Sequence, residues 1–105
     1  MGRIAIACYR PKPGKQQALE ALVRTHVPRL RAEGLTTDRA AVIMRANDGT
    51  IVEVFEWESE DAIERAHSNP AVLEIWNEYE ALCDYVPIAQ VAGAADLFSD
   101  FAPLD

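Results

Sequence analysis

The sequence predicts an α+β domain with one antiparallel sheet and two helical segments. Three observations predict it: extended apolar runs, apolar residues at helical spacing between them, and an element order of β-α-β-β-α-β. The chain has 105 residues, half of them hydrophobic. This is about the length that one independently folding core requires. We therefore expect a single domain over residues 1–105.

The first element is a strand at Arg3–Tyr9, which is apolar at nearly every position. Pro11, Pro13 and Gly14 follow it. Neither proline nor glycine continues a strand ladder well, so we expect the strand to end there.

A helix is expected next, because apolar residues recur with the period of one helix face. Pro28 lies within this helix and has no N–H for the carbonyl of Arg24, which predicts a kink or a restart near Val27. Gly34 then supplies the left-handed conformation in which many helices end. The residues of the apolar stripe are Leu19, Leu22, Val23, His26, Val27 and Leu30.

Two strands, Ala40–Arg45 and Ile51–Glu58, flank the sequence Asn47-Asp48-Gly49-Thr50. An Asp-Gly pair between extended apolar runs is typical of a β-hairpin, because the turn requires positive φ. We therefore expect these strands to pair with each other.

The second helical region has clear start signals. Ser59 is a good N-cap, and Glu60 and Asp61 in the first turn complement the positive end of the helix dipole. Asn69-Pro70 interrupts the region and predicts a new helical segment with proline at its first position. The apolar stripe expected on that segment is Val72, Trp76, Tyr79, Cys83 and Val86.

The last strand is expected at residues 97–103 (LFSDFAP). Residues 88–95 are rich in alanine, poor in β-branched residues and show helical spacing. A strand at residues 88–94 remains the alternative.

The element order is that of the ferredoxin-like split β-α-β unit, a four-stranded antiparallel sheet with both helices on one face. Arg3–Tyr9 and Ala40–Met44, however, are apolar on both alternating faces. The helices cover one face only, and an uncovered second face would expose a larger apolar patch than monomers usually do. We therefore expect a homodimer formed by sheet-to-sheet packing about a two-fold axis.

Composition excludes several classes of partner. The net charge of −7 disfavours nucleic acids and anionic membranes. No apolar run reaches the roughly 20 residues that span a bilayer. Cys8 and Cys83 lie in apolar surroundings, which favours buried thiols in a reducing cytoplasm over a disulfide. No Cys/His spacing resembles a zinc site, so we expect no metal.

The chain resembles the antibiotic biosynthesis monooxygenase (ABM) family of the dimeric α/β-barrel superfamily. The resemblance rests on Arg31-Ala32-Glu33-Gly34, on Trp57-Glu58-Ser59 and on Ala66-His67-Ser68-Asn69-Pro70. It implies a dimeric α/β barrel with one pocket per subunit, between the sheet and its helices. It also implies oxygenation without a metal, a flavin or any other cofactor, in which a deprotonated phenol or quinol reduces dioxygen.

Two features of the family pattern differ in this chain. Haem-degrading relatives carry an Asn, a Trp and a His where this chain has Ala7 or Cys8, Ala66 and Trp76, so haem degradation is not expected. Many members also carry a Glu two residues before the tryptophan of the third strand. In this chain that position is Phe55, and the neighbouring acids Glu53 and Glu56 lie at other positions. The role of the family's Glu is therefore not assigned to either acid.

Two histidines are candidates for the catalytic base, since the unperturbed pKa of histidine, about 6.5, is close to working pH. His67 matches the family motif and is the first choice; its structural alternative is a bond to a backbone carbonyl. His26 lies on the first helix's apolar stripe, where a satisfied core histidine is the alternative. Arg10 and Arg45 could meet an anionic substrate or be solvated strand ends. The candidate substrate-binding residues, each with a packing role as its alternative, are Tyr79, Trp76, Tyr9 and Trp57.

Three functions remain open. The first is a cofactor-independent monooxygenase acting on a small aromatic, quinol or polyketide-like substrate. The second is an isomerase or lyase that uses the same pocket for proton transfer. The third is a dimeric small-ligand-binding or stress-related protein without catalytic activity.

Overall fold

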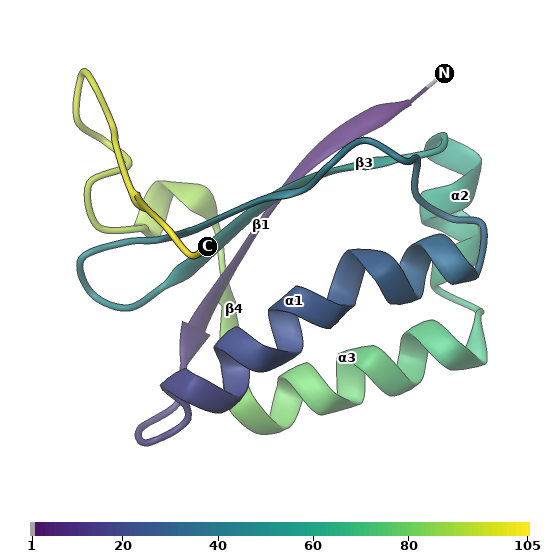
Figure 1. The fold of residues 1–105 in the computed structure, drawn as a ribbon, viewed down its shortest axis with the longest axis horizontal. Coiled ribbons are helices and arrows are strands. Elements are labelled where there is room, and N and C mark those ends of the chain that lie inside the picture. Colours follow the sequence, from purple (N-terminus) through teal and green to yellow (C-terminus); the bar gives the residue numbers. More distant parts are fainter. Residues whose placement is uncertain (1) are drawn as a thin grey trace.

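The computed structural model describes residues 2–105 and confirms the α+β fold (Figure 1). All strand pairs are antiparallel, in the order β4-β1-β3-β2-β5. Helices α1 and α3 lie side by side on one face of the sheet, here called the inner face (Figure 1). The elements are β1 (Arg3–Pro11), α1 (Gln16–Ala32), β2 (Val42–Arg45), β3 (Ile51–Trp57), α2 (Glu60–Ala66), α3 (Pro70–Leu82), β4 (Cys83–Val86), the 3-10 helix η1 (Ile88–Gln90) and β5 (Ala102–Pro103).

Helix α1 follows the predicted stripe closely: the six residues of that stripe are its buried residues. Pro28 lies inside the helix without ending it, so the expected restart near Val27 does not occur. Gly34 ends the turn after the helix with φ of 73°, as predicted. None of the helices between residues 2 and 105 combines the length and apolar character that a bilayer crossing requires.

The fourth strand differs from the prediction. It is β4, directly after α3, where a continuing helix stripe through Cys83 and Val86 was expected. Helix α3 ends because Cys83 is already extended (φ −153°, ψ 170°), and β4 pairs with the free edge of β1. The α3 stripe is Val72, Ile75 and Tyr79, and Trp76 lies at its edge, half buried.

The C-terminal segment was expected to hold the fourth and last strand. It holds a short fifth strand, β5, instead. Within residues 97–103 only Ala102–Pro103 is a strand, and it pairs with β2 at the opposite edge of the sheet from β4. Residues 88–94, the alternative, form η1 and turns. The last strand therefore lies within the expected range but is only two residues long, and neither expected range contains the strand that pairs with the free edge of β1.

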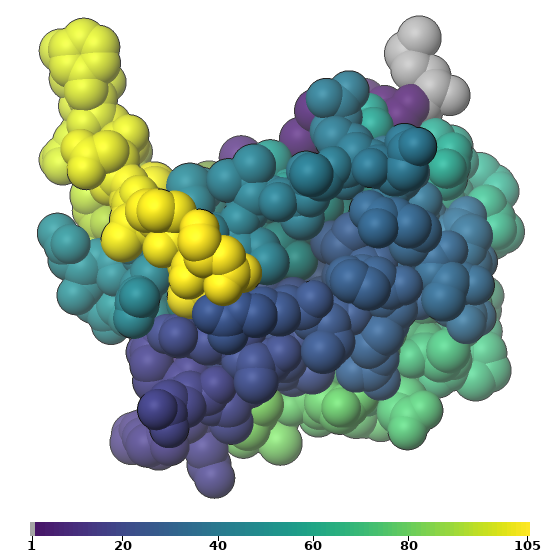
Figure 2. All heavy atoms as spheres, in the orientation of Figure 1, coloured from purple at the N-terminus to yellow at the C-terminus, as the bar shows by residue number. Residues whose placement is uncertain are grey.

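The outer face of the sheet, away from the helices, is only partly covered. Val91, Ala94 and Phe101 of the C-terminal segment pack on Cys8 and Val52. Elsewhere large apolar side chains remain exposed, namely Ile4 (61%), Ile6 (56%) and Val42 (53%). The C-terminal segment also projects beyond the sheet (Figures 1 and 2) and carries the exposed Leu97 and Phe98.

Candidate functional site

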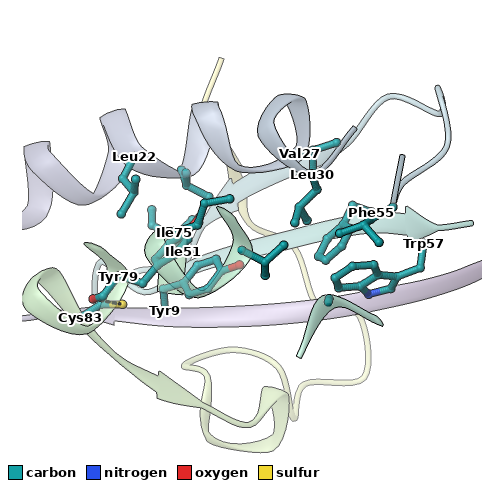
Figure 3. Close-up of a cluster of buried hydrophobic side chains, with 14 of the residues drawn as sticks. Tyr9, Leu22, Val27, Leu30, Ile51, Phe55, Trp57, Ile75, Tyr79 and Cys83 are labelled. Atoms are coloured by element: carbon teal, nitrogen blue, oxygen red, sulfur yellow. Dashed lines mark hydrogen bonds between the residues drawn. The ribbon is translucent and has the colours of Figure 1, made fainter. Parts of the chain in front are cut away.

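A cavity of about 720 Å³ lies between the inner face of the sheet and α3. Its volume is within the range of about 300–1,000 Å³ typical of small-molecule sites. Figure 3 shows several of its aromatic side chains lying between the sheet and the helical layer. The lining residues are Ala5, Ala7, Tyr9, His26, Phe55, Trp57, Leu73, Trp76, Asn77, Tyr79, Glu80 and Tyr85.

The period-2 alternation of β1 and β3 produces the sheet wall of the cavity. Ala5, Ala7 and Tyr9 alternate along β1 and all line the cavity. Ala5 is in register with Phe55 on β3. The two alanines leave room above the sheet, and Phe55 and the neighbouring Trp57 bound that room, with ring centroids 5.3 Å apart.

A buried polar cluster lies beside this wall, centred on Glu53. The Tyr9 hydroxyl donates to Glu53 Oε1 at 2.7 Å, and His26 Nδ1 lies 2.8 Å from the same oxygen. Glu53 is fully buried and His26 is 4% exposed. A carboxylate partner favours the proton on Nδ1, which leaves Nε2 of His26 as the nitrogen able to accept a proton. The arrangement therefore suits a general base whose tautomer is fixed by an acid.

Two stacked tyrosines join this cluster to α3. The Tyr9 and Tyr79 rings are 4.5 Å apart and 17° from parallel. Burial, with the nearby Glu53 carboxylate, raises the pKa of Tyr9 well above its usual 10. The same two causes raise the pKa of Tyr79. Both side chains therefore remain neutral phenols, able to donate hydrogen bonds but not to act as bases near pH 7.

The structure brings five of the six sequence-predicted site residues together. His26, Tyr9, Tyr79, Trp76 and Trp57 all line the cavity.

The sixth residue, His67, lies outside the cavity wall. It is the exposed C-cap of α2, and its Nδ1 is 2.9 Å from the carbonyl oxygen of Ile63, so that nitrogen donates. Its ring packs edge-on against Trp76 with centroids 5.3 Å apart. The hydrogen bond to the Ile63 carbonyl is the arrangement that the structural alternative for His67 described.

Sequence reasoning missed Glu53. The acid belongs to the inward-facing half of β3, between Ile51 and Phe55. Its register partner is Ala7, also on the inner face. The sequence does contain a sign of this role: Glu53 is the single acid among the inward-facing positions of β3, which are otherwise apolar. A buried acid needs hydrogen-bond partners, so such a position indicates a polar cluster.

The two arginines considered for an anionic substrate lie outside the cavity wall. Arg10 donates to the carbonyl of Gln90 at 3.4 Å. Arg45 pairs with Glu20 at 3.3 Å. Neither contact places a positive charge in the cavity.

The fold and the cavity together define a class: a small ferredoxin-like α+β domain with an aromatic pocket between sheet and helices. The family model described as antibiotic biosynthesis monooxygenase matches residues 3–78. The chain belongs to this family, as its motifs indicated.

Solved structures of similar fold come from three bacteria. Rv0793 of Mycobacterium tuberculosis is 22% identical, with a TM-score of 0.65 over 82% of this chain and 89% of that one. PA3566 of Pseudomonas aeruginosa is 25% identical, with a TM-score of 0.59 over 79% and 89%. NE2512 of Nitrosomonas europaea, described as a protein of unknown function, is 19% identical, with a TM-score of 0.59 over 95% and 98%. No curated protein matches the chain.

Proposed function

We propose that this protein is a cofactor-independent monooxygenase that oxidises a small aromatic phenol or quinol in the cavity. The observation that carries the proposal is the pairing of an aromatic-walled cavity with a buried His26–Glu53 hydrogen bond at its wall. A flat ring fits the walls, and its hydroxyl needs a base to become the electron-rich anion. The family to which the chain belongs supports the same chemistry.

In this proposal His26 Nε2 takes the proton of the substrate hydroxyl. The Glu53 carboxylate, 2.8 Å from Nδ1, stabilises the imidazolium that forms. Tyr9 donates to the same carboxylate oxygen and holds it in place. Glu53 is therefore a positioning residue, and His26 is the group that touches the substrate.

The phenolate then passes one electron to dioxygen, and the resulting phenoxyl radical and superoxide combine to form a carbon–oxygen bond. The peroxide receives the proton held by His26. Loss of the ring hydrogen with cleavage of the O–O bond releases water and leaves a carbonyl. The net change is one phenol and one dioxygen to one quinone and one water.

The walls of the cavity orient the ligand ring and limit its contact with water. Phe55, Trp57 and Trp76 present ring faces or edges to the cavity, and such surfaces favour a planar ligand over water. A fixed ring orientation and exclusion of water both favour productive electron transfer over side reactions.

We also propose a homodimer and a cytoplasmic location. The exposed Ile4, Ile6 and Val42 on the outer face of the sheet support sheet-to-sheet association. The buried, unpaired thiols of Cys8 and Cys83 support a reducing compartment.

The test is oxygen uptake with a panel of small phenols and quinols, corrected for their spontaneous oxidation with heat-denatured protein. We expect His26→Gln to lower kcat by about 10²–10⁴-fold, the usual contribution of a general base. His67→Gln is the matched variant, and we expect it to retain activity because His67 lies outside the cavity wall. The reverse pattern would assign the base to His67.

The same assay separates the alternatives. Equal turnover with and without oxygen would overturn the oxygenase and favour isomerisation in the same pocket. Tight ligand binding without any turnover would favour a non-catalytic binding protein.

A further inference from the structure

The charges around the cavity constrain its ligand beyond the proposed reaction. Among residues 2–105, no lysine or arginine lines the cavity. The ionisable groups in its wall other than tyrosines are His26 and the acid Glu80. Glu53 adds a second carboxylate directly behind His26. Any anionic group on a ligand would therefore face carboxylates without a compensating cation in the wall.

In the described part of the chain, no cation near the cavity pairs with a carboxylate of its wall: Lys12 contacts the backbone of a wall residue, and two arginines pair with acids outside the wall. Lys12 Nζ donates to the backbone carbonyl of Glu80 at 2.7 Å. Arg29 pairs with Glu78 at 2.6 Å, on the same helix as the rim of the cavity. Arg3, at the far end of β1, lies 3.8 Å from Glu60.

Helix α3 combines an acid and an aromatic ring at the cavity rim. Trp76 and Glu80 are four residues apart, so they are neighbours on one helix face, and both line the cavity. Tyr85 on β4 lines it too, and its ring is 6.2 Å from that of Tyr79. A carboxylate beside aromatic rings is the combination that attracts organic cations, by charge and by cation–π contact.

We propose that the ligand is an aromatic ring with a hydroxyl at one end and a protonated amine at the other. The hydroxyl meets His26 of α1 beside the buried Glu53, and the ammonium lies at the α3 rim beside Glu80, Trp76 and Tyr85. The placement of the ligand's hydroxyl rests on the proposed function. The inference adds that the opposite end of the ligand carries a positive charge.

The test is binding of three naphthalenes that share one hydroxyl and differ at the opposite end: 6-(aminomethyl)-2-naphthol, naphthalene-2,6-diol and 6-hydroxy-2-naphthoate. Binding is measured without oxygen by calorimetry, so that no turnover intervenes. We expect the ammonium compound to bind about tenfold or more tightly than the carboxylate, with the diol between them.

Two variants localise the effect. Glu80→Gln removes the charge at the rim and is expected to reduce the ammonium-to-carboxylate ratio to about threefold or less. Glu74→Gln removes the same charge from an exposed position of α3 that does not line the cavity, and is expected to leave the ratio unchanged.

A carboxylate that binds as tightly as the ammonium, or a ratio that Glu80→Gln does not change, overturns the inference. An absence of binding by all three compounds overturns both this inference and the proposed site. If no phenol or quinol supports oxygen uptake but the ammonium compound still binds more tightly than the carboxylate, only the proposed oxygenase activity is overturned.

Discussion

At the scale of single residues, Glu53 is the centre of the buried polar cluster. One of its oxygens accepts from Tyr9 and contacts His26, while the other, Oε2, is buried without a hydrogen-bond partner among residues 2–105. On its other side Glu53 borders a smaller cavity of about 210 Å³ between α1 and β2, which Ala41 also lines. A buried carboxylate is costly unless its partners are in place.

Removing the Glu53 carboxylate should therefore destabilise the fold. We expect Glu53→Ala to lower the free energy of unfolding by about 3 kcal/mol, because it leaves the Tyr9 hydroxyl and the His26 ring without their buried acceptor. Urea denaturation followed by circular dichroism measures the change. Glu58→Ala, at an exposed position just after the same strand, is the control, with an expected effect of about 0.5 kcal/mol or less. A loss below about 1 kcal/mol for Glu53→Ala would mean that the cluster is not a structural unit.

At the scale of elements, the junction between α2 and α3 positions the helical wall of the cavity. Asn69 Oδ1 accepts from the backbone N–H groups of Ala71 at 2.9 Å and Val72 at 3.3 Å, and Pro70 occupies the first helical position. The cap fixes where α3 begins, and therefore which of its residues face the sheet.

This cap can be tested by two substitutions at one position. Asn69→Ala removes the acceptor and should lower the unfolding free energy by about 1 kcal/mol, whereas Asn69→Ser keeps an uncharged acceptor oxygen and should lose less. Both variants lose the hydrogen bond from the Asn69 amide to Glu33, so their difference reports the cap. Thermal denaturation of the two variants side by side gives the difference. Equal melting temperatures would show that α3 does not depend on its side-chain cap.

Some elements of the structure can be predicted from the sequence and others cannot, and the reason is physical. Helix α1, the hairpin and the Ser59 cap were predicted correctly because their signals are local: a 3.6-residue period, an Asp-Gly turn and a capping serine. Strand β4 was missed because four residues are too few to show a period, and its conformation depends on pairing with β1. Its Cys83 and Val86 also continue the spacing of α3.

The candidate site divides in the same way. Aromatic residues and a histidine on an apolar stripe are visible in the sequence, and they do line the cavity. Glu53 was not singled out because its partners are remote, 44 residues away for Tyr9 and 27 for His26. His67 fits the family motif, yet its position at the exposed end of α2 follows from tertiary packing that the motif does not describe.

At the scale of the whole molecule, the outer face of the sheet is the surface that the proposed dimer would bury. Its isoleucines and valine are more than half exposed, and Leu97 and Phe98 of the projecting C-terminal segment are 90% and 86% exposed. Several large apolar side chains exposed on one sheet face are typical of an interaction surface.

A charge on this face should separate the proposed dimer. We expect the natural chain to sediment as a dimer at micromolar concentration and Ile6→Glu to sediment as a monomer, because the carboxylate would be buried without a partner. Ala81→Glu, on the exposed side of α3, adds the same charge away from the sheet and should remain dimeric. A monomeric natural chain in analytical ultracentrifugation would contradict the proposal.

Strand β1 contributes to two surfaces at once, the cavity wall on its inner side and the exposed apolar face on its outer side. Its odd positions Ala5, Ala7 and Tyr9 line the cavity, while Ile4 and Ile6 point to the opposite side. Loss or gain of a single residue within this strand would exchange the two sets, filling the pocket with isoleucine and leaving small alanines outside. Ligand space and the exposed apolar surface can therefore change independently by substitution, but a length change in β1 alters both at once.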